Sequence, residues 1–113
     1  MKRILLIGEH PYLLNTRAAI LRRLGSVEVR LPADFDRNPD GECFDLLILC
    51  HSLDGHTVQA ASLAARKRWP GIRVLQLVRY SRELPQSSAA DDIAIATEPS
   101  DVIRCAERLL LDK

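Results

Sequence analysis

Short apolar runs recur along the chain and alternate with segments in which apolar residues return at helical spacing. Five runs predict β-strands, at residues 3–8, 27–31, 44–50, 72–78 and 92–97. Unbroken runs such as RILLIG and FDLLILC are typical of strands buried on both faces of a parallel sheet. VEVRL, at residues 27–31, alternates with period two, which predicts an edge strand with Leu31 on its inward side.

The first helix is predicted between Pro11 and Gly25, because proline suits a first helical turn and glycine suits a helix end. Its inward face is expected to consist of Leu14, Ala18 and Leu21. The same periodicity places its basic residues in water, namely Arg17, Arg22 and Arg23.

Two further helices are predicted. The first covers residues 54–69 and has an inward face of Val58, Ala61, Ala65 and Trp69. The second follows Ser100, which can cap it, and its inward face is Val102, Ala106, Leu109 and Leu110. Residues 32–42 and 79–90 contain prolines together with glycine or serines, so they predict loops or reduced helices.

Strands that alternate with helices predict an α/β fold with parallel pairing through right-handed crossovers. We expect a three-layer, doubly wound, flavodoxin-like domain with five strands in the order 2-1-3-4-5 and with reduced second and fourth helices. A chain of 113 residues that is 47% hydrophobic is long enough for one core. We therefore expect a single domain over residues 1–113.

Composition narrows the classes of function. The net charge is +1 and the 16 basic residues are scattered, so neither nucleic acid nor a membrane surface is an expected partner. The apolar runs are too short to span a membrane, and the N-terminus does not resemble a signal peptide. Three cysteines without a CxxC pair are typical of reduced thiols, which favours a cytoplasmic protein.

The predicted strand order brings two strand ends together. Strands one and three flank the switch point of the fold, where ligands bind in proteins of this architecture. Gly8, Glu9 and His10 follow the first strand, and Cys50 and His51 close the third. We expect these residues to meet in one crevice, with Val78 and Glu98 added by strands four and five.

The stretches RILLIGEHPYLLNTRAAILRRLG, FDLLILCHSLDG and ATEPSD resemble the receiver domain of the response regulators of bacterial two-component signalling, and the resemblance covers nearly the whole chain. Receivers end their first strand with paired acids that hold magnesium; Gly8 and Glu9 stand there, so one acid is missing. The phosphate-accepting aspartate closes the third strand, where this chain has Cys50.

Three further receiver positions also differ. The hydroxyl residue at the end of strand four falls on Val78, and the phosphate-binding lysine before proline falls on Glu98. The switch aromatic of strand five falls on Ile95. Transfer of a phosphoryl group to a carboxylate needs a divalent cation and groups that hold the phosphoryl oxygens, and Glu98 would repel phosphate. The resemblance therefore implies a degenerate pseudo-receiver with no cofactor and no enzymatic activity, which binds another protein or itself independently of phosphorylation.

A different interpretation uses the crevice for chemistry. Glu9, His10, Cys50 and His51 are all zinc-compatible residue types, and a reactive Cys50 beside His51 would suit a thiol- or metal-dependent sensor or enzyme. Side chains of adjacent strand residues point to opposite sides, however, which argues against a Cys50–His51 pair. The simpler interpretation is a buried structural Cys50, rim histidines, and a Glu98 that pairs with a nearby histidine or with Arg79.

A surface site is also predicted. Arg79, Tyr80 and Arg82 combine arginine with tyrosine, which is a frequent pairing in protein interfaces. Receivers commonly associate through their fourth helix, fifth strand and fifth helix. Because the fourth helix of this chain is predicted to be reduced, that mode of association is not expected to carry over.

Overall fold

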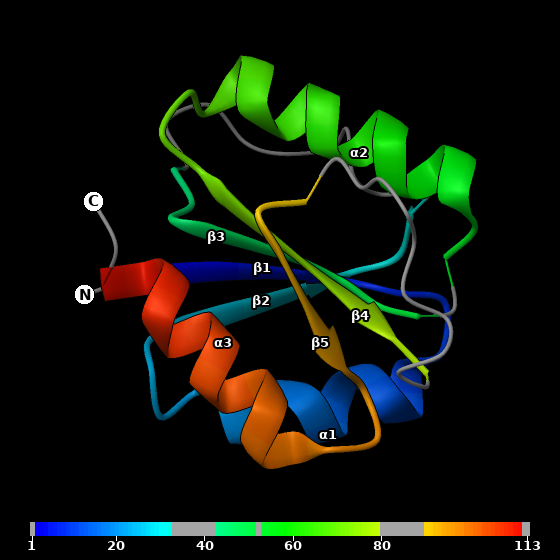
Figure 1. Ribbon diagram of the computed structural model, residues 1–113, viewed down its shortest axis with the longest axis vertical. Coiled ribbons are helices and arrows are strands. Elements are labelled where there is room, and N and C mark those ends of the chain that lie inside the picture. Colours follow the sequence, from blue (N-terminus) through cyan, green and yellow to red (C-terminus); the bar gives the residue numbers. More distant parts are fainter. Residues whose placement is uncertain (1, 33–42, 52, 80–89, 112–113) are drawn as a thin grey trace.

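The computed structural model of the chain describes residues 2–32, 43–51, 53–79 and 90–111 (Figure 1). In chain order its elements are β1 (Arg3–Ile7), α1 (Pro11–Leu21), β2 (Ser26–Arg30), β3 (Leu46–Leu49), α2 (Gly55–Arg68), β4 (Arg73–Val78), β5 (Asp92–Ile95) and α3 (Pro99–Leu111). The two reduced helices were predicted on segments that fall largely outside the described residues. None of the described helices is both long and apolar enough to cross a membrane.

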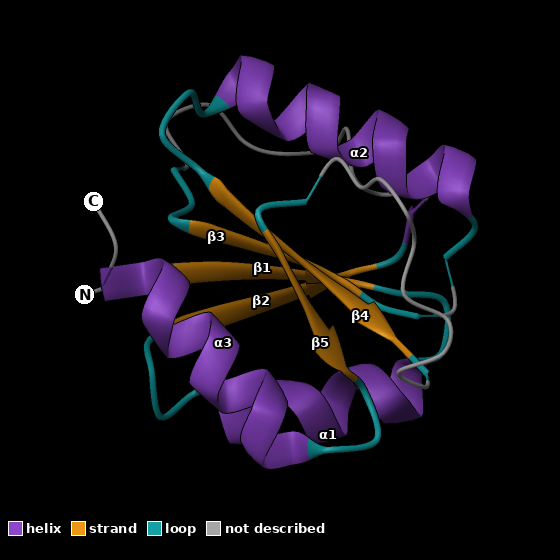
Figure 2. Ribbon diagram, viewed as in Figure 1, coloured by secondary structure: helices purple, strands orange, loops and turns teal. Residues whose placement is uncertain are grey.

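The five strands form one parallel sheet in the order β2-β1-β3-β4-β5. Helix α2 covers one face of this sheet, while α1 and α3 lie side by side on the other (Figures 1 and 2). The predicted flavodoxin-like, doubly wound, three-layer architecture is confirmed. The central strands β1 and β3 pair directly, with Ile7 opposite Leu49, so their carboxyl ends meet as expected.

Two hydrophobic cores lie on the two sides of the sheet. Leu6 and Ile48 point toward α1 and α3, and Leu5 and Leu47 point toward α2. Every residue of β3 is fully buried, as predicted for a strand covered on both faces. The predicted inward faces of all three helices are also buried.

The helix starts follow from local capping. Pro11 occupies the first turn of α1, and the carboxylate of Asp54 caps α2 by accepting the Thr57 amide at 2.7 Å. Helix α3 begins at Pro99, so Ser100 lies inside its first turn and the prediction of Ser100 as the cap is wrong. A proline is well suited to the first helical position because its missing N–H has no intrahelical partner there.

The turn into β2 depends on a close backbone contact. Helix α1 ends at Leu21, earlier than predicted, and the Ser26 amide donates to the Lys2 carbonyl at 2.9 Å. A Cβ atom on Gly25 would lie 2.3 Å from that carbonyl oxygen, so glycine permits the approach of the two chain segments. Val27 and Val29, predicted to share one face with Leu31, pack against the core, whereas β2 ends at Arg30 and Leu31 lies beyond it and is 40% exposed.

Candidate functional site

The crevice predicted from the strand order is present where β1 and β3 end. The Cys50 amide donates to the Ile7 carbonyl at 2.9 Å, which extends the pairing of the two strands and brings Cys50 beside Gly8. Cys50 is only 2% exposed and belongs to the core that faces α1 and α3. The prediction that it is buried is confirmed.

The space around Gly8 is already filled. A Cβ atom at this position would lie 2.9 Å from Leu14 Cδ2, 3.0 Å from Cys50 Cβ and 3.1 Å from Cys50 Sγ. Real Cβ atoms essentially never approach other atoms within 3.0 Å, so any larger residue would displace the core. Leu14 of α1 and the Cys50 thiol therefore occupy the volume that a side chain at the end of β1 would need.

Arg17 closes the crevice from the side of α1. It was predicted to face water, and this is wrong: its side chain is partly buried, and Nη2 lies 3.2 Å from His51 Nδ1. A guanidinium group only donates hydrogen bonds, so Nδ1 of His51 must be the acceptor in this contact. Arg17 follows Leu14 by three positions, which places the two side chains on the same face of α1.

The Cys50 thiol lies in an environment that keeps it protonated. Burial raises the pKa of Cys50, and this effect outweighs the opposite influence of the nearby Arg17 guanidinium. Because the thiolate is the nucleophile and the metal ligand, the geometry favours a structural cysteine.

The orientation predicted for Cys50 and His51 is also corrected. The prediction assumed that both residues continue the strand, with side chains on opposite sides. Strand β3 ends at Leu49, however, and a turn follows in which the Leu53 amide donates to the Cys50 carbonyl at 3.2 Å. Strand alternation therefore does not apply: His51 contacts Arg17, and the same guanidinium lowers the pKa of Cys50 against the larger effect of burial.

The remaining crevice residues are more dispersed. Glu9 and His10 are exposed in the turn before α1, and Val78 is buried at the end of β4. Ile95 ends β5 and is partly buried. Glu98 is exposed, and its carbonyl oxygen accepts the amides of the first turn of α3.

The ion pair predicted for Glu98 is not formed. Within the described residues, the Glu98 side chain makes no contact with His10, His51 or Arg79. The site that the structure assembles is therefore smaller than predicted: it consists of Gly8, Cys50 and His51, with Leu14 and Arg17 added by α1.

A divalent cation does not fit this arrangement. In the described parts of the chain, no three residues of the types His, Cys, Asp and Glu are grouped so that they could hold a metal ion. The magnesium ion that receivers hold needs oxygen ligands. Here Glu9 has no acidic neighbour at Gly8, and Cys50 supplies a buried protonated thiol.

A cavity of about 130 Å³ opens between α1 and α3, and Arg17, which also contacts His51 in the crevice, is one of its lining residues. Its lining is mostly apolar and includes Leu13, Thr16, Ile20, Ala96, Pro99 and Val102. Tyr12 and Leu13, at the start of α1, are 89% and 39% exposed. The sequence contained a signal for this feature, because α1 carries apolar residues beside its inward stripe as well as on it.

The predicted interface residues are only partly described. Arg79 is exposed just after β4, and its carbonyl oxygen accepts the Thr97 hydroxyl at 3.4 Å. Tyr80 and Arg82 lie outside the described residues. Arg79 therefore stays a candidate for surface recognition that the described contacts do not test.

Comparison with solved structures places the chain among response-regulator receivers by fold. The beryllofluoride-activated receiver domain of DrrB matches with a TM-score of 0.78 and 21% identity, over 97% of both chains. A chain from the complex of the histidine kinase ThkA with the response regulator TrrA matches with a TM-score of 0.77 and 22% identity, over 97% of this chain and 99% of that one. A CheY-like receiver domain protein of Methanospirillum hungatei matches with a TM-score of 0.73 and 19% identity, over 97% and 94%.

These likenesses establish the receiver-domain fold. No protein-family model matches the chain, and no curated protein matches it either. Because function resides in sites and not in folds, the role of this chain must be argued from the crevice and the surface.

Proposed function

We propose that this protein is a phosphorylation-independent, non-enzymatic interaction module of the cytoplasm, a pseudo-receiver that binds a protein partner. The observation that carries the proposal is the packing around Gly8. A side chain at the end of β1 would have to displace Leu14 and Cys50, and Cys50 stands where receivers carry the phosphate acceptor.

The charges in the crevice support the same conclusion. Phosphoryl transfer to a protein carboxylate depends on a bound cation and on groups arranged to stabilise the developing charge. The only fixed positive charge recorded in the crevice, among the described residues, is Arg17, which is engaged with His51 and Cys50. Arg17 therefore takes the place of a ligand and ties α1 to the end of β3.

The cavity between α1 and α3 is the surface that best suits a protein partner. An apolar groove between two helices can receive the apolar stripe of a third helix. One solved structure of similar fold is a complex of the response regulator TrrA with the histidine kinase ThkA, which supports a protein partner for this chain. We propose that the partner of this chain contacts Leu13 and the cavity beside it.

The loss of phosphoryl chemistry can be tested by titrating the ¹⁵N-labelled protein with magnesium and beryllofluoride, the reagent that activates the DrrB receiver domain. We expect no saturable shift in the amide signals of Gly8, Cys50 or Ala96. The variant Cys50→Asp should be equally silent, because Glu9 still has no second acidic residue beside it at position 8. Saturable shifts at these amides in the unmodified protein would contradict the proposal.

The binding surface can be tested by partner capture with matched variants. Leu13→Asp places a carboxylate at the cavity, whereas Leu63→Asp places one on the exposed side of α2, where Leu63 is 60% exposed. We expect Leu13→Asp to lose a partner that both the unmodified protein and Leu63→Asp retain. Loss in both variants, or in neither, would argue against the cavity as the binding surface.

The alternative of a thiol- or metal-dependent function has a direct test. Cys50→Ser removes the thiol but keeps a side chain of similar size. We expect this variant to bind the captured partner normally, and we expect the unmodified protein to bind no zinc in native mass spectrometry. A stoichiometric zinc that is lost in Cys50→Ser would favour the alternative.

A further inference from the structure

The outer edge of β5 is closed by charged side chains of the same chain. Among the strands that the structure describes, β5 is the last of the sheet and pairs only with β4. An edge strand normally presents unpaired N–H groups to which another strand can add. In β5 the Ile93 and Ile95 amides, which lie two residues apart and so point to the same side, both bind carboxylates.

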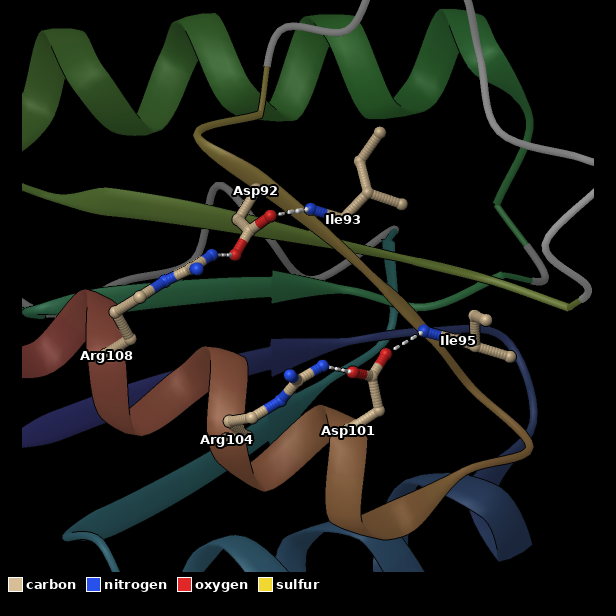
Figure 3. Close-up of polar contacts among 6 residues, drawn as sticks. All are labelled: Asp92, Ile93, Ile95, Asp101, Arg104 and Arg108. Atoms are coloured by element: carbon tan, nitrogen blue, oxygen red, sulfur yellow. Dashed lines mark hydrogen bonds and ion pairs between the residues drawn. The ribbon is translucent and has the colours of Figure 1, made fainter.

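Each of these amides has its own acceptor. The Ile95 amide donates to Asp101 Oδ2 at 3.0 Å, which joins the end of β5 to the first turn of α3. The Ile93 amide donates to Asp92 Oδ1 at 2.9 Å. Figure 3 shows both carboxylates lying between the strand and the helix.

Helix α3 supplies a cation to each carboxylate. Arg104 pairs with the second oxygen of Asp101, and Arg108, about one helical turn further on, pairs with the second oxygen of Asp92 (Figure 3). The Asp101 and Asp92 side chains are only 15% and 22% exposed, so both charges need compensation. The Ile95 amide and then Arg104 hold the pKa of Asp101 below its usual range, which keeps the acceptor ionised.

We propose that these two carboxylate–arginine pairs block strand addition at β5, so that a second copy of this chain cannot extend the sheet there. The pairs form within one chain, and their charges are therefore not available to bridge two copies. Self-association of this protein must then use another surface. This inference is independent of the binding role proposed above, because it rests on Asp92, Asp101, Arg104 and Arg108, none of which lines the cavity.

The double variant Asp92→Ala/Asp101→Ala removes both acceptors and exposes the two amides. We expect it to associate as its concentration rises from micromolar to near-millimolar in sedimentation velocity, whereas the unmodified protein shows no association through β5. Asp45→Ala is the matched control, because the Asp45 carboxylate also accepts a backbone amide, that of Arg3 at 2.9 Å, but does so where the central strands β1 and β3 begin. The control should behave as the unmodified protein does.

A rescue identifies the surface that associates. Adding Ile93→Lys to the double variant puts a charge on the exposed edge, a common means of preventing edge pairing, and should restore the monomer. A folded double variant that stays monomeric throughout, or association that Ile93→Lys leaves unchanged, would overturn the proposal.

Hydrogen exchange keeps the proposal testable if the double variant does not fold. In the unmodified protein at monomeric concentration, the Ile93 and Ile95 amides should be protected. In Arg104→Gln/Arg108→Gln, which releases the carboxylates without removing them, both amides should exchange about tenfold faster or more. Unprotected amides in the unmodified protein, or unchanged exchange in this variant, would also overturn it.

Discussion

At the scale of single residues, Gly8 is the position where a larger side chain would most clearly disturb the core. A methyl group at Gly8 would lie within about 3 Å of Leu14 and Cys50. Gly8→Ala should therefore lower the free energy of unfolding by roughly 1–3 kcal/mol, the usual cost of overpacking a core. Urea denaturation measures this loss.

Gly55 provides the control for Gly8. A Cβ atom on Gly55 would meet nothing within 4 Å, and the residue begins α2. Gly55→Ala should leave stability unchanged or raise it slightly, because alanine reduces the freedom of the unfolded chain. Equal losses in the two variants would mean that helix or turn propensity, and not packing at the crevice, controls the effect.

At the scale of the element, the Asp54 carboxylate at the start of α2 makes the stability of the fold depend on pH. The Thr57 amide and hydroxyl, through their hydrogen bonds to Asp54, hold the pKa of this carboxylate below its usual range. A carboxyl group whose pKa is lower in the folded state stabilises the fold above its unfolded pKa, and this contribution is lost as the pH falls through the folded pKa. The contribution is therefore complete at neutral pH and disappears in the acidic range.

Asp54→Asn isolates this contribution, because asparagine still caps a helix but does not titrate. We expect the variant to fold at neutral pH and to lose the acid-dependent part of stability that Asp54 provides, as measured by thermal unfolding over a series of pH values. If the variant and the unmodified protein showed the same dependence of stability on pH, Asp54 would be excluded as a source of that dependence.

The sequence predicted the positions of the strands but not the contacts that form at the β5 edge of the sheet. Short apolar runs located four of the five strands, and the period-two alternation of VEVRL located the strand at 27–31. The association of Asp92 and Asp101 with Arg108 and Arg104 could not be predicted, because it depends on the rotation of α3 about its axis relative to β5. That rotation is set by tertiary packing.

At the crevice, the sequence predicted the meeting of Gly8 with Cys50 but not the part played by Arg17. The meeting follows from strand order alone. The position of Arg17 depends on whether the crevice has room for a long side chain, which is decided by Leu14 and Cys50 together. Helical periodicity predicts that such a residue faces water, because the pattern of one helix contains no information about the neighbouring elements.

Across the whole molecule, the two cores share the central strands and should unfold together. Trp69 is the only tryptophan and lies in the core under α2, so its fluorescence reports on that side of the sheet. Leu6→Ala, in the core under α1 and α3, should cost about 2–5 kcal/mol and shift the fluorescence and far-ultraviolet circular dichroism transitions equally. Separate transitions would show that the two cores are independent units.

The packing of Gly8, Leu14, Cys50 and Arg17 limits the substitutions that evolution could introduce one at a time in this protein. An acidic residue placed alone at position 8 meets a full core, and an aspartate placed alone at position 50 meets Arg17 and still has no metal site. Each single change toward a phosphate-accepting pocket would therefore either lower the stability of the fold or leave the metal site incomplete. Several changes would have to occur together. Under the function proposed above, selection could therefore change the surfaces of this protein far more readily than it could build a phosphate-accepting crevice.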